Sequence, residues 1–291
     1  MRLLIDCCGI GYKIAYGMPA LSYNGNNTHI IFGFLKQILD LAEKFKTNQF
    51  IFAWDSRQSY RKMFDPDYKK RPADPAKQAL IDDARRQFNL LYKDVLPMMG
   101  FQNVFMQTGY EADDLIAWLC YRRPDDYMIV SADEDLLQLL STTRFYATRI
   151  WDFKKDRIIT EEDFLNKYGG IKPIDWAKVK AMAGCSSDNV PGIAGVGQET
   201  AIKYLHGNLK DGKAKEKIES AEGRQTIDRC FYLVALPYPG DREIVIPEII
   251  DDELYSLDFR DAFQKYGCGS FISGNNFEEW REAFHLVSGR V

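Results

Sequence analysis

Short apolar runs that end in carboxylates are the feature that most constrains the fold of this chain. Residues 3–6, 50–55 and 128–133 read as buried strands and end in Asp6, Asp55 and Asp133, with Asp135 two positions further on. Apolar residues at helical spacing over about residues 28–45 lie between the first two runs, which predicts a β-α-β unit. The carboxyl ends of parallel strands face one common crevice, so these acids are expected to converge there.

A second group of acids opens a predicted helix over about residues 112–121. Glu111, Asp113 and Asp114 fall within four residues, directly before an apolar helical face. A helix N-terminus favours anions by only about 1 kcal/mol, so a bound cation is the natural way to neutralise this cluster. The alternative is an ordinary capped helix with solvated acids. Together with the strand-end acids, these oxygen ligands favour Mg²⁺ or Mn²⁺ over zinc.

Positive charge is concentrated in one segment of this acidic chain. The 291 residues carry a net charge of −4, yet residues 56–93 hold ten Lys or Arg against five Asp, a local charge of +5 that leaves −9 elsewhere. Aromatic residues alternate with the cations, a pattern that suits single-stranded nucleic acid with phosphates on the cations and bases on the rings. A solvated loop with incidental charge is the alternative.

The other composition signals indicate a reducing compartment. The six cysteines include no C-x-x-C pair, so they form neither a disulfide framework nor a zinc site. No apolar run approaches 18 residues, and no signal peptide is visible. A cytoplasmic protein without membrane contact is therefore expected. The sequence is silent on oligomeric state, and a monomer is taken as the working expectation.

The second half of the chain is expected to be mostly helical. Within it, Gly192, Gly195 and Gly197 permit a tight hairpin between two helices whose amides can approach phosphates. We therefore expect an α/β core over residues 1–158, which includes the basic segment at about 56–93. A mostly helical region follows over residues 159–291, with the hairpin and its flanking helices at about 176–206.

With these stretches in hand, the chain resembles the structure-specific 5′-nuclease family. This is the flap endonuclease and 5′ to 3′ exonuclease group of bacteriophages and of the N-terminal domains of bacterial DNA polymerases. The resemblance runs from Leu3 to about Pro237 through several motifs in the same order. It implies a PIN-like parallel-sheet nuclease core with a helical arch, followed by a helix-three-turn-helix. It also implies metal-dependent hydrolysis of branched or 5′-ended DNA, in replication and repair, that leaves a 5′-phosphate and a 3′-hydroxyl.

The resemblance assigns roles to the acids of this chain. It implies two divalent ions, one held mainly by Asp55, Asp113, Asp114 and Asp133, and the other by Asp135 and the acids of the loop after Gly184. The full set of implied metal residues is Asp6, Asp55, Glu111, Asp113, Asp114, Asp133, Asp135 and Asp188.

The resemblance also assigns catalytic and DNA-binding residues. Lys69 and Arg71 look like the family's active-site cations, which act together with Asp133, and the segment from Val190 to Lys203 looks like the duplex-binding hairpin, often with K⁺ on its carbonyls. The implied DNA contacts are Lys13, Arg57, Arg61, Tyr68, Lys69, Lys70, Gly192, Gly195, Gly197 and Lys203. RNA–DNA hybrids are a further implied substrate.

One departure from the family pattern bears on the metals. The family commonly reads Gly-Asp-Ser-Ser-Asp-Asn where this chain has Cys185 after Gly184. A neutral thiol coordinates Mg²⁺ poorly, so Cys185→Asp is expected to lower the Mg²⁺ concentration needed for half-maximal cleavage. The alternative hypothesis is a structure-specific DNA-binding protein with impaired catalysis. A PIN-like ribonuclease shares the acidic core, but it does not normally have the glycine hairpin or the basic segment.

Overall fold

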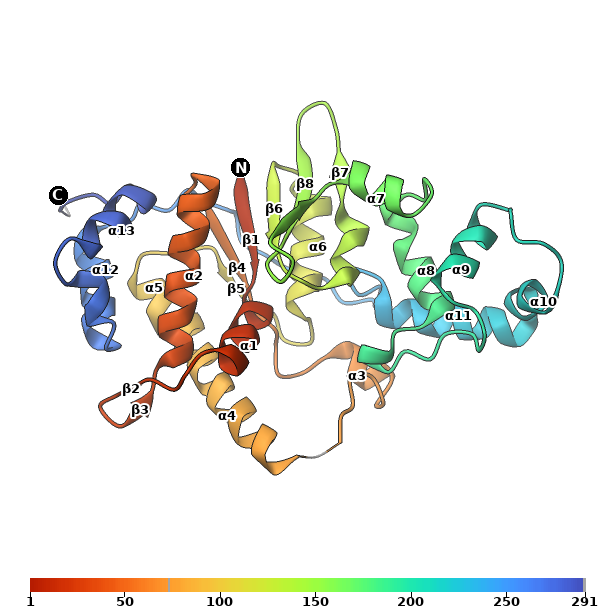
Figure 1. Cartoon of the computed structure of the whole chain (residues 1–291), viewed down its shortest axis with the longest axis horizontal. Coiled ribbons are helices and arrows are strands. Elements are labelled where there is room, and N and C mark those ends of the chain that lie inside the picture. Colours follow the sequence, from red (N-terminus) through yellow and green to blue (C-terminus); the bar gives the residue numbers. More distant parts are fainter. Residues whose placement is uncertain (73, 290–291) are drawn as a thin grey trace. The chain divides into compact units, whose positions relative to one another are not determined.

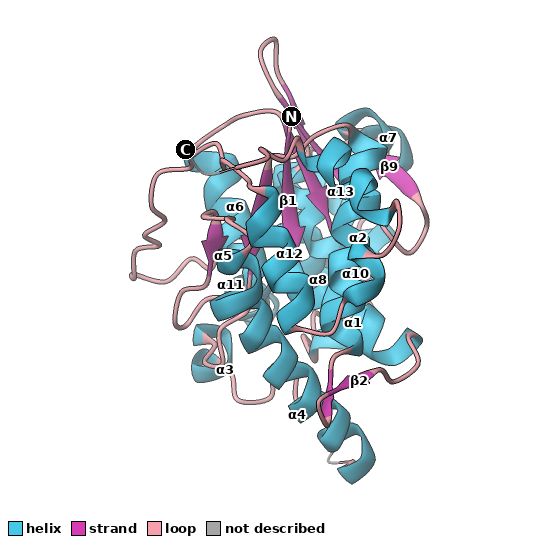
Figure 2. Ribbon diagram, turned by 90° about the vertical axis from the view of Figure 1, so that its left-hand side faces the viewer, coloured by secondary structure: helices cyan, strands magenta, loops and turns pink. Residues whose placement is uncertain are grey.

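The computed structural model describes residues 1–72 and 74–289, which form two compact units. Unit 1 contains residues 1–54, 74–105 and 246–289, and unit 2 contains residues 55–72 and 106–245. Figure 1 labels their elements, and Figure 2 colours them by type. Ala73, inside the expected arch, and Arg290 and Val291, at the end of the expected second domain, lie outside the described residues. No helix within the described ranges is long and apolar enough to cross a membrane.

Unit 1 contains the β-α-β unit expected from the sequence. Strand β1 (Arg2–Asp6) pairs in parallel with β4 (Phe50–Ala53), which pairs in parallel with β5 (Val104–Phe105). Helix α2 (His29–Phe45) connects β1 to β4 and buries its apolar face. Other elements of unit 1 are β2 (Ser22–Tyr23), β3 (Asn26–Asn27), α4 (Pro75–Leu90), a π-helical turn (Leu91–Val95), α5 (Leu96–Met98) and a 3-10 helix (Gly269–Ile272).

The chain after β1 is helical, although Gly9 and Gly11 follow the strand closely. Helix α1 (Cys7–Gly17) starts at once, capped by the Asp6 carboxylate, which accepts a hydrogen bond from Gly9 N at 2.9 Å. A Cβ at Gly9 would lie 2.2 Å from the Asp6 carboxylate, and one at Gly11 would lie 2.2 Å from the Phe88 ring. These glycines therefore allow close packing instead of reversing the chain.

The C-terminal helices belong to unit 1, so the units divide the chain differently from the boundary expected near residue 158. Helices α12 (Ser256–Lys265) and α13 (Asn276–Phe284) place Phe259 and Phe284 against Phe101, with ring centroids 6.0 and 5.9 Å away. Phe284 also lies 5.6 Å from Phe50 of β4. Burial of these large rings joins the last described residues to the first strands.

Unit 2 contains the strands β6 to β9. Strand β6 (Tyr127–Val130) runs parallel to β8 (Ala147–Asp152), whose two other partners, β7 (Ser141–Thr142) and β9 (Arg157–Ile159), are antiparallel. The helices are α3 (Tyr60–Phe64), α6 (Ala112–Arg122), α7 (Glu161–Lys167), α8 (Trp176–Ala183), α9 (Gln198–Leu205), α10 (Lys213–Glu219), α11 (Ala221–Val234) and 3-10 turns at Glu134–Leu139, Pro173–Asp175 and Ser186–Asp188.

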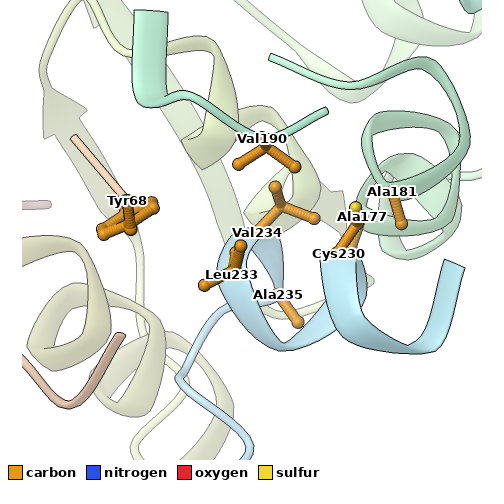
Figure 3. Packing of buried hydrophobic residues seen from close by; sticks show 8 residues of the cluster. All are labelled: Tyr68, Ala177, Ala181, Val190, Cys230, Leu233, Val234 and Ala235. Atoms are coloured by element: carbon orange, nitrogen blue, oxygen red, sulfur yellow. The ribbon is translucent and has the colours of Figure 1, made fainter. Parts of the chain in front are cut away.

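Helices α8 and α11 pack together around a small apolar cluster (Figure 3). Ala177 and Ala181 on α8 are small enough to let α11 approach closely, and Cys230 lies beside them. Val190 and Tyr68 extend the cluster from two loops. The cluster thus ties the basic segment and the glycine loop to one helix pair.

Candidate active site

The N-terminus of α6 joins two of the acid groups expected from the sequence. Asp55, at the start of unit 2, accepts a hydrogen bond from Ala112 N at 2.8 Å. Glu111 is the residue before the helix, and Asp113 lies half-buried in its first turn. Free amides at a helix N-terminus stabilise nearby carboxylates, which explains how Asp55 is held beside the Glu111 turn.

Asp114 faces inward and is fully engaged by protein groups. Its two oxygens accept hydrogen bonds from both terminal nitrogens of Arg61, at 2.7 and 2.8 Å. They also accept from Glu111 N at 3.0 Å and Tyr238 N at 2.7 Å. The exposed fractions of the Arg61 and Asp114 side chains are 3% and 0%. We therefore assign this pair a structural role, in place of the metal and DNA roles expected from the sequence.

Glu111 is the acceptor of a three-donor network. Lys69 Nζ lies 2.8 Å from one carboxylate oxygen, Ser59 Oγ lies 2.9 Å from the other, and the Tyr68 hydroxyl donates at 3.3 Å. Burial acts to raise the pKa of Glu111, but the positive charges of Lys69 and Arg61 outweigh it and lower the pKa to about 2. Glu111 therefore stays ionised and holds Lys69 in place.

The low pKa of Glu111 predicts a pH-dependent contribution to stability. Its pKa in the folded state, about 2, lies below the unfolded value of about 4.3. The carboxylate therefore stabilises the fold above about pH 4.3, and this stability is lost as the pH falls toward 2. In EDTA, the stability difference between the parent and Glu111→Gln, followed by circular dichroism, is expected to shrink across this window. The exposed Glu199→Gln is the control, and a Glu111→Gln difference that stays constant with pH would contradict the interpretation.

Lys69 is positioned by its backbone as well as by Glu111. Its φ of 50° lies in the left-handed region, which is uncommon for a lysine, and its N donates to Asp188 O at 2.9 Å. The Asn189 amide donates to the Asp67 and Lys70 carbonyls at 3.1 and 2.6 Å. The turn at residues 67–70 is thus bonded to the loop that carries Asp188. The Lys69 side chain is 29% exposed.

Asp133 and Asp135 follow strand β6, as the sequence predicts. Asp133 is half-exposed, and its Oδ1 accepts from Asp135 N at 2.8 Å. Asp135 is buried, with its Oδ1 2.6 Å from Lys180 Nζ. Burial and the Asp133 charge raise the pKa of Asp135 to about 6, although Lys180 acts in the opposite direction. Asp188 has a raised pKa as well, because it is buried and Asp133 and Glu111 lie near enough to repel its charge.

The glycine loop supports Asp188. Gly184 and Gly192 have positive φ, and a Cβ on Gly192 would lie 2.3 Å from Gly184 N. Cys185 and Val190 exchange backbone hydrogen bonds of 2.8 and 2.9 Å across the loop. Gly195 also has positive φ, and Gly197 precedes α9. Only glycine permits the close approach at 184 and 192, so this hairpin cannot be built with larger residues.

The remaining candidate residues differ in exposure. Arg57, Lys70, Arg71 and Lys203 of unit 2 are exposed, whereas Tyr68 is 3% exposed within the apolar cluster. Tyr68 therefore serves packing and the Glu111 network instead of presenting its ring to a base. Asp6 and the exposed Lys13 belong to unit 1, where Asp6 caps α1.

The acids of unit 2 carry the oxygen ligands that hard divalent ions prefer, but they are not arranged as a complete set of metal ligands. In residues 1–72 and 74–289, no group of three or more His, Cys, Asp or Glu side chains is arranged to hold a metal ion. Carboxylate oxygens are nevertheless the donors that Mg²⁺ and Mn²⁺ prefer, and these ions keep several waters in place of protein ligands. Burial is the main cause of the raised pKa values of Asp135 and Asp188, and repulsion from neighbouring carboxylates adds to it.

Sequence reasoning missed two members of the site. Ser59, a donor to Glu111, had no distinguishing signal in the sequence. Lys180 did have a signal in the sequence. It lies on the face of α8 that buries Trp176 and Ala177, where a charged residue is unusual.

Comparison with known proteins identifies the family. Residues 1–169 match the family described as 5′-3′ exonuclease, N-terminal resolvase-like domain. The 5′-3′ exonuclease of Bacillus subtilis is 32% identical over 211 residues, which cover 70% of this chain and 69% of that protein. DNA polymerase I of Mycobacterium leprae is 29% identical over 238 residues, 77% of this chain but 24% of the polymerase. The chain thus spans about a quarter of the length of its DNA polymerase I relatives.

A solved structure shares the fold. The bacteriophage T5 flap endonuclease in complex with DNA and metal ions superimposes with a TM-score of 0.63 at 17% identity, covering 97% of this chain and 98% of that one. At this identity the likeness establishes the α/β nuclease fold. The match over residues 1–169 shows that the chain belongs to the 5′-3′ exonuclease family, through its N-terminal resolvase-like domain.

Proposed function

We propose that this chain is a divalent-metal-dependent 5′-nuclease. It hydrolyses phosphodiesters of branched or 5′-ended DNA, as a flap endonuclease or 5′-3′ exonuclease in replication and repair, and leaves a 5′-phosphate and a 3′-hydroxyl. The observation that best supports this is the gathering of Lys69 with Glu111 and Asp188, next to Asp133 and Asp135, in a member of the 5′-3′ exonuclease family. The relative with a solved structure was crystallised with DNA and metal ions.

The acids are proposed to hold Mg²⁺ or Mn²⁺, and the resemblance implies two ions. The set is Asp6, Asp55, Glu111, Asp113, Asp133, Asp135 and Asp188. When bound, such ions supply Lewis-acid stabilisation of the phosphoryl oxygens and a water of lowered pKa. Asp55 and Asp133 are proposed to help hold the metal ions. Glu111 instead fixes the position of the Lys69 ammonium through its 2.8 Å ion pair. K⁺ on the carbonyls of residues 190–197 is proposed as an additional duplex anchor.

DNA contacts are proposed at exposed cations and at the glycine hairpin. The residues are Lys13, Arg57, Lys69, Lys70, Arg71, Gly192, Gly195, Gly197 and Lys203. RNA–DNA hybrids are a further proposed substrate, and the protein is proposed to act as a monomer in the cytoplasm of a bacterium or of a phage-infected cell.

The proposal is tested by incubating the full chain with a 5′-end-labelled flap substrate in Mg²⁺, Mn²⁺ or EDTA. Products of flap length in either metal, and none in EDTA, are the expected result. Mononucleotide products would favour the exonuclease over the flap endonuclease. Tight binding of the flap without cleavage in either metal would favour the second candidate, a structure-specific DNA-binding protein with impaired catalysis, which Cys185 favours because its thiol is a poor ligand for Mg²⁺.

Lys69 is expected to contribute directly to the rate. Lys69→Met removes a cation that stabilises charge on the scissile phosphate, and losing one such electrostatic contact typically costs about 10²- to 10³-fold in rate. Lys62→Met is the matched control, because Lys62 is an exposed lysine of the same segment and is not among the proposed DNA contacts. Single-turnover cleavage measures both. A Lys69→Met rate equal to that of Lys62→Met would remove Lys69 from the mechanism.

A further inference from the structure

Lys180 is a buried cation among the acids of unit 2. Its Nζ lies 2.6 Å from Asp135 Oδ1, and the two side chains are 8% and 10% exposed. A buried ammonium is costly unless an anion compensates it, and Asp135 supplies that anion. A lysine is ordinarily charged at neutral pH, and the Asp135 carboxylate stabilises that charge here.

The same ammonium reaches Cys185. Lys180 Nζ donates to Cys185 Sγ at 3.7 Å, and the thiol lies 3.0 Å from Ser187 Oγ. Cys185 is the position where the family commonly has an aspartate. An acid there would add negative charge beside Asp135 and Asp188, whereas this chain has a thiol at the position and an ammonium next to it. The thiol and the ammonium act in the same direction, because both reduce the attraction of this side of the site for a divalent ion.

We propose that the Lys180 ammonium pairs with Asp135 in the place of a metal ion. The chain then binds one divalent ion tightly and a second only weakly. This inference rests on the proposed nuclease function and deepens it. Lys180 thus determines how tightly the second ion binds. It engages the Asp135 oxygen at 2.6 Å, an oxygen that a second ion would need as a ligand. The half-exposed Asp133 remains accessible to the first ion.

The test measures Mn²⁺ binding to the full chain by calorimetry or by electron paramagnetic resonance, without substrate. The parent is expected to show one tight site and one weaker site. Lys180→Met is expected to tighten the weaker site by about 10- to 100-fold, the size of effect that groups around a metal commonly have on its affinity. Adding Cys185→Asp to Lys180→Met is expected to tighten it further. Lys178→Met is the matched control, because Lys178 lies on the same helix, is 53% exposed and pairs with Asp175.

A second measurement does not depend on counting sites. In EDTA, Lys180→Met is expected to melt at a lower temperature than the parent, because Asp135 loses its buried partner. Mn²⁺ is then expected to raise its melting temperature by more than it raises that of the parent, since the ion takes over the role of the ammonium. Lys180→Gln, which keeps a hydrogen-bond donor near Asp135, provides the comparison if the methionine variant folds poorly.

The outcomes separate this inference from the proposed function. Two equally tight Mn²⁺ sites in the parent, or Mn²⁺ binding and Mn²⁺-dependent melting that are the same in Lys180→Met and the parent, would overturn the role of Lys180. Cleavage of the flap substrate would then still support the nuclease. The expected Mn²⁺ pattern without any cleavage would support Lys180 and overturn the nuclease. Absence of Mn²⁺ binding in every variant would overturn both.

Discussion

Replacing Asp133 by asparagine is expected to reduce flap cleavage by about 10³-fold, because a loss of several kcal/mol of metal-based transition-state stabilisation corresponds to three factors of ten in rate. Asparagine keeps an Oδ1 that can accept the hydrogen bond from Asp135 N, now 2.8 Å long, so the turn after β6 is preserved. The charge of the half-exposed carboxylate is the property removed. Cleavage under single-turnover conditions in saturating Mg²⁺ measures the effect.

Glu134→Gln is the matched control for Asp133→Asn. Glu134 is the next residue, is exposed, and lies 3.8 Å from the exposed Lys155. An exposed ion pair of this kind contributes little, so the variant is expected to keep the parent rate and stability. Equal rates for the two variants would show that Asp133 is not part of the metal site. Recovery of Asp133→Asn activity at high Mn²⁺ would instead show that the residue contributes affinity.

Arg61→Met is expected to destabilise unit 2 by about 3–5 kcal/mol, the usual cost of removing one partner of a buried ion pair. Asp114, with 0% of its side chain exposed, would lose the two hydrogen bonds from Arg61. The carbonyls of Leu233 and Ala235 would lose their Arg61 donors at 3.0 and 2.8 Å. Urea unfolding followed by tryptophan fluorescence measures the loss of stability.

Lys62→Met is the control for this prediction, since Lys62 is the exposed neighbour of Arg61 on α3. It is expected to change stability by less than about 0.5 kcal/mol, as surface substitutions usually do. A loss below about 1 kcal/mol for Arg61→Met would mean that the pair contributes no more than a typical surface pair. A DNA-contact role for Arg61 would then be open again.

The sequence predicts the parts of this molecule that depend on local pattern. The parallel strands, the helix between β1 and β4, and the placement of Asp55 beside the Glu111 turn follow from apolar runs that end in acids. The roles of Arg61, Asp114 and Tyr68 could not be predicted in this way. Each reads as a polar or basic surface residue, and its burial depends on contacts with residues 233–238 or with the α8–α11 cluster.

The packing partner of the C-terminal helices could not be predicted from the local sequence pattern either. Their charged, amphipathic pattern predicts helices but not a partner, because any apolar face satisfies the same pattern. The observed partner is decided by large rings: Phe259 and Phe284 pack on Phe101, which also contacts Phe50. Lys180 shows the same limit at the site, since only the fold places its ammonium at Asp135.

The hydrogen bonds of Arg61 and Asp114 have a consequence for how the protein is made. Arg61 is translated early but needs the carbonyls of Leu233 and Ala235, and Asp114 needs the amide of Tyr238. A nascent chain that has not yet released residue 238 from the ribosome cannot complete this interior. The hydrogen bonds that bury Arg61 and Asp114 therefore form only after residue 238 has left the ribosome.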